Sequence, residues 1–188
     1  MPPSPPPPLP TRADIDATAA RVAPLVRRTP VVTVDPGDLG LVDHHAPVLL
    51  KLELLQHPGS FKSRGAHEQL LADDLPAAGV VAASGGNFGA AVAYAARRLE
   101  VPAAIFVPAS TAAAKLDRVR AFGAHVEVIP GFYDDALAAS RAHAAATGAR
   151  FLHAFDQPEM LAGPAPWPAS CASRRASTGW WWRWAAAG

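Results

Sequence analysis

The sequence lacks the features that define several classes of protein. It has a single cysteine, Cys171, which excludes a disulfide scaffold and a cysteine-based zinc cluster. No apolar run approaches the roughly 20 residues that span a bilayer, so no membrane partner is expected. The 17 basic and 16 acidic residues leave a formal charge of +1, which gives no support to a nucleic-acid partner. The N-terminus shows no secretory signal pattern, and we therefore expect a cytoplasmic protein.

Metal-ligand spacing is also missing. The seven histidines include the adjacent pair His44-His45, but they do not recur at the intervals of a metal site, so no metal is expected. Proline and tryptophan, in contrast, are abundant and unevenly placed. Residues 1–10 are nearly all proline, which predicts a disordered tail, with a ligand for an SH3-type domain as the alternative. All five tryptophans follow Gly163, where regular patterning stops.

Between these two segments the chain alternates regularly. Helical spacing of apolar residues predicts a helix over 11–26, and alternation predicts a strand over 48–55. Further predicted strands cover residues 79–83, 102–107, 125–129 and 150–154. Predicted helices between them cover residues 87–99, 111–122 and 133–146. Strands and helices in this order, joined by short connections, predict an α/β fold with parallel sheets and flanking helices.

Two short segments could carry chemistry. In Pro58-Gly59-Ser60-Phe61-Lys62-Ser63-Arg64-Gly65, a lysine follows a predicted strand and is flanked by glycines. A lysine held in a cleft and partly desolvated can lose its proton and attack a carbonyl carbon, whereas most lone lysines are simply exposed. In Ser84-Gly85-Gly86-Asn87-Phe88-Gly89, glycines follow a strand and open a helix, where bare backbone amides favour an anion. An ordinary strand-to-helix turn is the alternative for this segment, since its glycines do not match a dinucleotide fingerprint.

Taken together, these segments resemble the threonine dehydratase and serine racemase branch of the fold-type II pyridoxal-phosphate enzymes. The resemblance covers residues 11–163, in order and with sensible spacing. The matching stretches are Arg28-Thr29-Pro30, Lys51-Leu52-Glu53 with Gln56, Ser60-Phe61-Lys62-Ser63-Arg64-Gly65-Ala66, Ser84-Gly85-Gly86-Asn87, Ala93-Tyr94-Ala95-Ala96, Val101-Pro102, Val107-Pro108, Asp156-Gln157-Pro158 and Leu161-Ala162-Gly163.

The resemblance implies a role for each of these site residues. Lys62 is expected to form the Schiff base with pyridoxal 5'-phosphate, Phe61 to pack beside the cofactor ring, and Asn87 to hydrogen-bond its phenolic oxygen. The stretch Ser84-Gly85-Gly86-Asn87 is expected to receive the substrate carboxylate. The implied reaction removes the α-proton and β-hydroxyl of L-threonine or L-serine and ends in a 2-keto acid and ammonia, with the cofactor as electron sink. A homodimer or homotetramer is expected from the same resemblance.

Two positions depart from the family pattern. Phe88 stands where the family usually has histidine, which removes a polar group expected near the carboxylate site. Gly85 stands where racemases of this branch carry a serine hydroxyl, so dehydration is favoured over racemisation. A racemase, another β-eliminating enzyme and a non-catalytic remnant that binds a partner through the tryptophan-rich tail are the alternatives.

The resemblance also implies a domain organisation. Residues 11–75 are expected to begin the large cofactor domain, 76–158 to form a small α/β domain, and 159–163 to return to the large one. After Ala-Gly the family continues with Gly-Thr, a valine-rich strand and a tetraglycine loop that cradles the cofactor phosphate. None of these is visible in residues 164–188.

Translating the tryptophan-rich segment back into codons offers an explanation for residues 164–188. Tryptophan has one codon, TGG, and residues 180–188 read W-W-W-R-W-A-A-A-G. With G- or C-ending codons, a shift of one base turns this stretch into V-V-V-A-V-G-G-G followed by another glycine. The tail is therefore interpreted as a frameshift after Gly163, with a genuine tryptophan-rich segment as the alternative. A chain without the phosphate loop is expected to bind its cofactor weakly and to be inactive.

Overall fold

The fold was analysed in a computed structural model that describes residues 9–41, 46–71, 74–155 and 157–164. The proline tail over 1–8, the pair His44-His45 and the tryptophan-rich segment from 165 onward lie outside these residues, as does Asp156. Within the described ranges, no helix is both long and apolar enough to cross a lipid bilayer.

Helix α1 (Arg12–Val22) begins where the sequence predicts and ends four residues early. Thr11 caps it reciprocally, because its hydroxyl accepts from the Asp14 N–H and the Asp14 carboxylate accepts from the Thr11 N–H at 2.8 Å. The helix stops just before Pro24, which has no N–H to donate to another turn.

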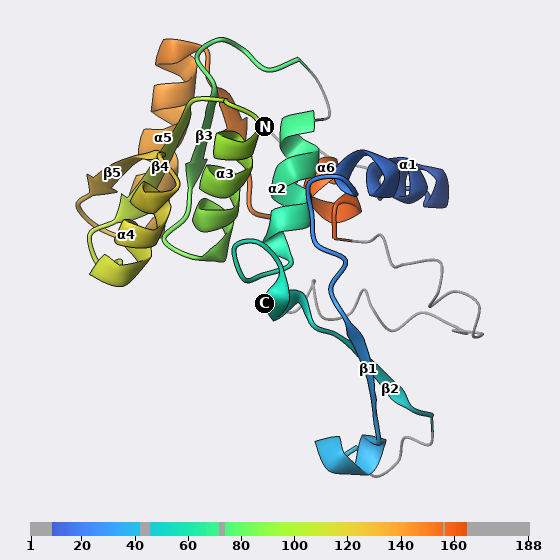
Figure 1. Ribbon diagram of the computed structural model, residues 1–188. Helices are drawn as coiled ribbons and strands as arrows, with labels where there is room; N and C mark the ends of the chain where they lie inside the picture. The colour runs from blue at the N-terminus through green and yellow to red at the C-terminus, as the bar shows by residue number, and fades with distance from the viewer. Residues whose placement is uncertain (1–8, 42–45, 72–73, 156, 165–188) are drawn as a thin grey trace, which may run out of the picture.

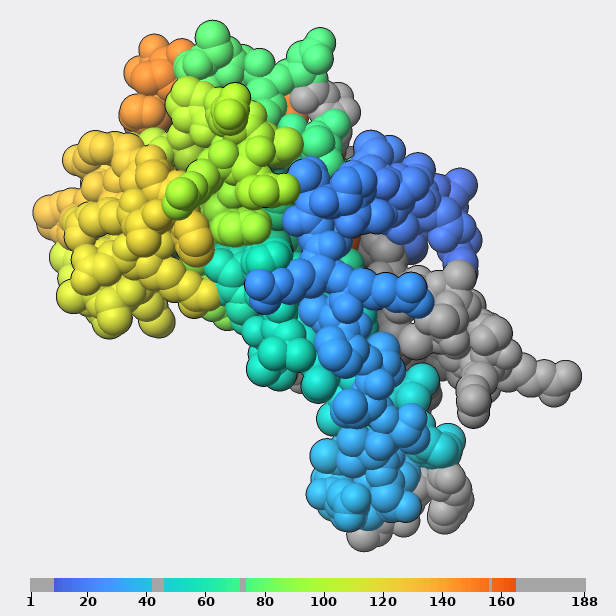
Figure 2. Space-filling model, in the orientation of Figure 1, coloured from blue at the N-terminus to red at the C-terminus, as the bar shows by residue number. Residues whose placement is uncertain are grey.

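A two-stranded antiparallel arm follows α1. Strand β1 (Val31–Val34) was not predicted, and it pairs with β2 (Val48–Lys51) through the 3₁₀ turn η1 (Pro36–Leu39). The predicted strand over 48–55 is half right, since the second half forms the 3₁₀ turn η2 (Glu53–Leu55) and leaves Leu54 exposed. Figure 1 shows β1 and β2 projecting from the rest of the chain, and Figure 2 shows this arm as a separate lobe.

The remaining elements form a parallel sheet with helices on both faces. Its order is β5-β4-β3-β6, and every neighbouring pair is parallel. The strands are β3 (Val80–Ala83), β4 (Ala103–Pro108), β5 (His125–Ile129) and β6 (Arg150–Leu152). The helices are α2 (Lys62–Leu71), α3 (Asn87–Arg98), α4 (Ala113–Ala121), α5 (Tyr133–Thr147) and α6 (Pro158–Ala162). The α/β fold class and the parallel sheet predicted from the sequence are confirmed.

The core follows from the two faces of β3, which is buried throughout. Val80 and Ala82 point toward one cluster, which holds the alanine face of α3 together with residues of α2, α4 and α6. Val81 points toward a second cluster on the opposite face, with Phe106 and the α5 residue Ala136. This alternation is the period-2 pattern of a strand covered on both sides. Helix α2 lies alongside α3 in Figure 1, and these two helices pack against each other.

Candidate active site

Lys62 begins helix α2 and is only partly exposed. Its Nζ donates a hydrogen bond to the carbonyl oxygen of Ala154 at 2.7 Å and lies 5.0 Å from the centroid of the Phe61 ring. Burial lowers the pKa of the Lys62 amine below its ordinary value, because a desolvated ammonium is disfavoured. The Phe61 ring itself is 41% exposed. An amine with a lowered pKa is suited to attack on a carbonyl carbon.

Sheet register brings Lys62 to the glycine-rich loop. Strands β3 and β6 are parallel neighbours with Ala82 opposite Leu152. Ser84 and Ala154 each follow two residues later, so both lie just past the carboxyl edge of the sheet, after neighbouring strands that are about 4.8 Å apart within the sheet. Since the Lys62 amine is bound to Ala154, the lysine and the loop after β3 share this edge. The carboxyl edge of a parallel sheet is where such folds bind ligands.

The loop is shaped by close backbone approach. The Ser84 N–H donates to the carbonyl of Phe106, and the Ser84 hydroxyl accepts from the Gly86 N–H at 3.2 Å. A Cβ on Gly89 would lie 2.4 Å from the Ser84 carbonyl oxygen, so only glycine lets α3 begin this close to the strand. Asn87 is exposed at the first position of the helix, whose early N–H groups have no partner within the helix. The arrangement presents amide and hydroxyl donors to an anion.

Phe88 does not face this loop's exposed side. Its side chain is 3% exposed and packs in the hydrophobic cluster between α3 and the sheet. The residue that follows Asn87 therefore contributes to the core here. The polar group that the family pattern places near the carboxylate is not replaced by an apolar side chain at the loop surface.

A buried ionic network holds the start of α2. The Arg64 guanidinium donates to both carboxylate oxygens of Glu53 at 2.8 Å and to the Arg27 carbonyl at 3.1 Å. Glu53 also accepts from the Thr29 hydroxyl at 2.5 Å and lies 4.0 Å from the Lys51 Nζ. Burial acts to raise the pKa of Glu53, but the hydrogen bonds from Arg64 and Thr29 and the two nearby cations outweigh it and lower that pKa. The network ties two other family-like stretches, those of Thr29 and of Glu53, to the segment that carries Lys62.

A second group fixes the segment that holds the lysine amine. The Gln69 side-chain amide donates to the His153 carbonyl at 3.0 Å and to the Gln157 side-chain oxygen at 2.6 Å. The same oxygen of Gln157 accepts from the His153 N–H at 2.7 Å. These contacts bind the chain around Ala154 to helix α2 itself. Reading the sequence did not single out Gln69, because a glutamine in a polar-looking segment carries no signal of burial.

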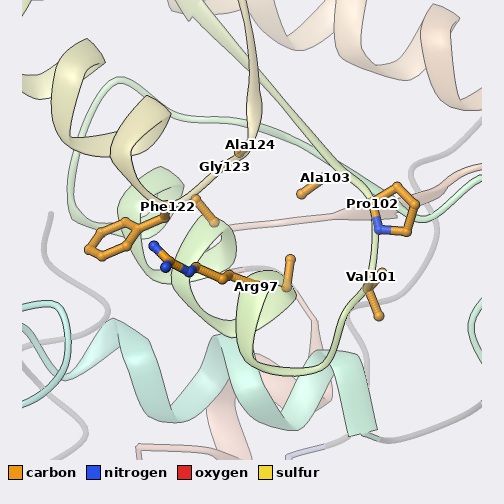
Figure 3. Close-up of a pocket in the computed structure, with 9 residues that line it drawn as sticks. Arg97, Val101, Pro102, Ala103, Phe122, Gly123 and Ala124 are labelled. Carbon is orange, nitrogen blue, oxygen red and sulfur yellow. The ribbon is translucent and has the colours of Figure 1, made fainter.

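The pocket drawn in Figure 3 lies at the other edge of the sheet. It has a volume of about 230 Å³ and is formed by residues at the start of β4 and before β5 and by the C-terminal part of α3. The lining residues are Ala93, Ala96, Arg97, Val101, Pro102, Ala103, Phe122, Gly123 and Ala124. Arg97 at its rim donates to the Ala121 carbonyl at 3.1 Å, which satisfies the end of α4. This pocket is separate from the lysine and the glycine-rich loop.

Similarity to known proteins agrees with the site. Residues 22–166 match the family described as "Pyridoxal-phosphate dependent enzyme". The chain is 42% identical over 156 residues to the L-threonine dehydratase IlvA of Mycobacterium bovis, covering 80% of this chain and 36% of that protein.

Two solved structures are similar to the fold. The threonine deaminase of T.th. superposes with a TM-score of 0.72 at 38% identity, over 82% of this chain and 48% of that one. Maize serine racemase superposes with a TM-score of 0.73 at 32% identity, over 80% and 46% of the two chains. The chain thus spans less than half the length of each relative. It belongs to the family of pyridoxal-phosphate dependent enzymes.

Proposed function

We propose that this chain carries the part of an ammonia-lyase active site that contains the reactive lysine, and that the substrate of this site is L-threonine or L-serine. The observation that carries the proposal is the half-buried Lys62 amine, which lies at the carboxyl edge of the sheet together with the Ser84–Asn87 loop. The names of the similar threonine dehydratase and threonine deaminase support this substrate class.

The residues at this edge fit one side of the family's cofactor. Lys62 would hold pyridoxal 5'-phosphate covalently, Phe61 would pack on its ring, and Asn87 would hydrogen-bond its phenolic oxygen. The Ser60 hydroxyl is buried without a hydrogen-bond partner among the described residues, which leaves a polar group for a ligand to satisfy. When bound, the cofactor supplies an electron sink that makes removal of the α-proton feasible.

The chain's own groups supply orientation and proton transfer. Burial favours the neutral form of the Lys62 amine, which can act as nucleophile and then as the base that takes the α-proton at Nζ. The loop amides and the Ser84 hydroxyl would orient the substrate carboxylate, so that its Cα faces the lysine. The ionic network around Glu53 holds α2 and therefore the lysine in place.

The domain division at 75/76 and 158/159, the cytoplasmic location and the dimeric or tetrameric assembly stay predictions. Packing of α6 on α1 and α2 supports a return of the chain to its N-terminal part after residue 158. Serine racemase is the second candidate function, because a rice serine racemase is 36% identical to this chain over 151 residues. A remnant that binds a partner through residues 164–188 would be revealed by pull-downs with and without that segment.

The function is tested with the full chain and a Lys62→Ala control. Pyridoxal 5'-phosphate is titrated while visible absorbance is followed, and ammonia, 2-keto acid and D-serine are then measured with L-threonine and L-serine. We expect weak absorbance that requires Lys62 and little or no ammonia release from L-threonine, because residues 164–188 do not contain the phosphate loop. D-Serine without keto acid would favour a racemase. Absorbance that is absent, or that is unchanged in Lys62→Ala, would refute the proposal.

A further inference from the structure

A hydroxyl from another segment fills the place of the missing side chain at position 85. A Cβ built on Gly85 would lie 2.4 Å from the Thr111 Oγ1 and 3.1 Å from its Cγ2. The backbone of Gly85 is outside the left-handed region, so its conformation would accept any residue. Glycine is therefore required here by Thr111 and not by the backbone.

Thr111 is fixed at the same edge of the sheet as the loop. Its N–H donates to the carbonyl of Pro108, the last residue of β4, at 2.9 Å. The side chain is partly buried, and no described residue forms a hydrogen bond with its hydroxyl. The hydroxyl thus sits against the Ser84–Asn87 loop with its donor and acceptor capacity unused.

We propose that Thr111 contacts the substrate, its hydroxyl donating a hydrogen bond to the α-carboxylate bound at the Ser84–Asn87 loop. This inference rests on the proposed function. The Ser84 hydroxyl accepts from the Gly86 N–H, which leaves its own proton to donate, so the loop and Thr111 together offer two hydroxyl donors. A hydroxyl at position 85 is absent from the sequence, and Thr111 supplies one from the turn after β4.

The test measures binding of L-serine to the full chain with cofactor added, followed by amide NMR shifts of the loop. Thr111→Val keeps the shape of the side chain and removes the hydroxyl. Losing a hydrogen bond to a charged group should raise the dissociation constant about tenfold. Thr111→Ser should restore most of the affinity. Ser110→Ala removes an exposed hydroxyl from the same turn and should change nothing, which makes it the matched control.

A double variant that moves the hydroxyl from position 111 to position 85 gives a second measurement. Thr111→Ala clears the space at position 85, leaving the Cβ of residue 111 at 3.3 Å, a contact that a small shift relieves. The double variant Gly85→Ser with Thr111→Ala should recover affinity that Thr111→Ala loses, because the hydroxyl returns to nearly the same place.

The outcomes separate this inference from the function on which it rests. If the unaltered chain binds neither L-serine nor L-threonine, the proposed function fails and the inference fails with it. If the unaltered chain binds and Thr111→Val binds equally well, Thr111 is not a substrate contact and the proposed function stands. Loss in Thr111→Val, recovery in Thr111→Ser and no change in Ser110→Ala would support the inference.

Discussion

Arg64→Leu removes the main cation from the ionic network that holds helix α2. Leucine fills part of the space, but the Glu53 carboxylate loses both hydrogen bonds from the guanidinium and keeps the one from the Thr29 hydroxyl. The Glu53 side chain is only 16% exposed, so water cannot fully replace the two lost bonds. Removing one partner of a buried ion pair costs about 3–5 kcal/mol. Such a loss is a large part of the about 5–15 kcal/mol that stabilises a typical domain.

The assay is urea unfolding followed by far-UV circular dichroism. Arg12→Leu is the matched control, since Arg12 is also an ion-paired helical arginine, but its side chain and that of Asp16 are 77% and 60% exposed. This control should change the free energy of unfolding by about 1 kcal/mol or less. If Arg64→Leu costs no more than Arg12→Leu, the network does not hold α2 and this reasoning is wrong.

The pH dependence of stability gives an independent check on the ionic network around Glu53. The folded pKa of Glu53 is lowered, so its stabilising contribution is present above the ordinary value of 4.5 and is lost as the pH falls through the folded pKa. The difference in stability between Arg64→Leu and the unaltered chain should therefore narrow below the ordinary pKa. A difference that stays constant from neutral pH into acid would contradict this origin.

Packing, protonation and reading frame each give one further test. Gly65→Ala should lower the free energy of unfolding by about 1–3 kcal/mol in urea, because a Cβ there meets the Met160 Sδ at 2.4 Å and the Met160 carbonyl at 3.2 Å. Burial lowers the pKa of His67, so near and below the ordinary value of 6.5 the unfolded chain binds more protons than the folded chain. The free energy of unfolding should therefore fall as the pH drops below 6.5, and it should fall less in His67→Gln. Resequencing the gene from the Leu161 codon should find Gly-Thr and tetraglycine one base out of frame, and their absence from both frames would end the frameshift interpretation.

The strands and helices after Gly79 could be predicted because their patterns are simple. Strand β3 is uniformly apolar, and α5 ends at Gly148, which adopts a φ of 75° that favours glycine. Helix α2 was not predicted, because it buries Arg64, His67 and Gln69 and so lacks an apolar stripe. Polar side chains can be buried only when they have hydrogen-bond partners. For Arg64 and Gln69 those partners lie elsewhere in the chain, where no local sequence pattern reveals them.

The candidate site, like the fold, could be predicted only in part from the sequence. Its motifs pointed to Lys62 and the Ser84–Asn87 loop, and the parallel register of β3 and β6 explains why segments this far apart share one edge. Thr111 was read only as the start of a helix. Its contact with Gly85 depends on how the turn after β4 packs on the turn after β3, which is a tertiary relation.

The central claim is that Lys62 is the residue that engages pyridoxal 5'-phosphate. The chain has three lysines, of which Lys115 is exposed and Lys51 lies in the ionic network with a side chain 10% exposed. Brief incubation with the cofactor, reduction by borohydride and peptide mass spectrometry would locate the attached group. The account predicts preferential labelling of Lys62 despite its burial, loss of most label in Lys62→Arg and little loss in Lys115→Arg. Label that follows exposure, with Lys115 modified most and Lys62→Arg without effect, would contradict it.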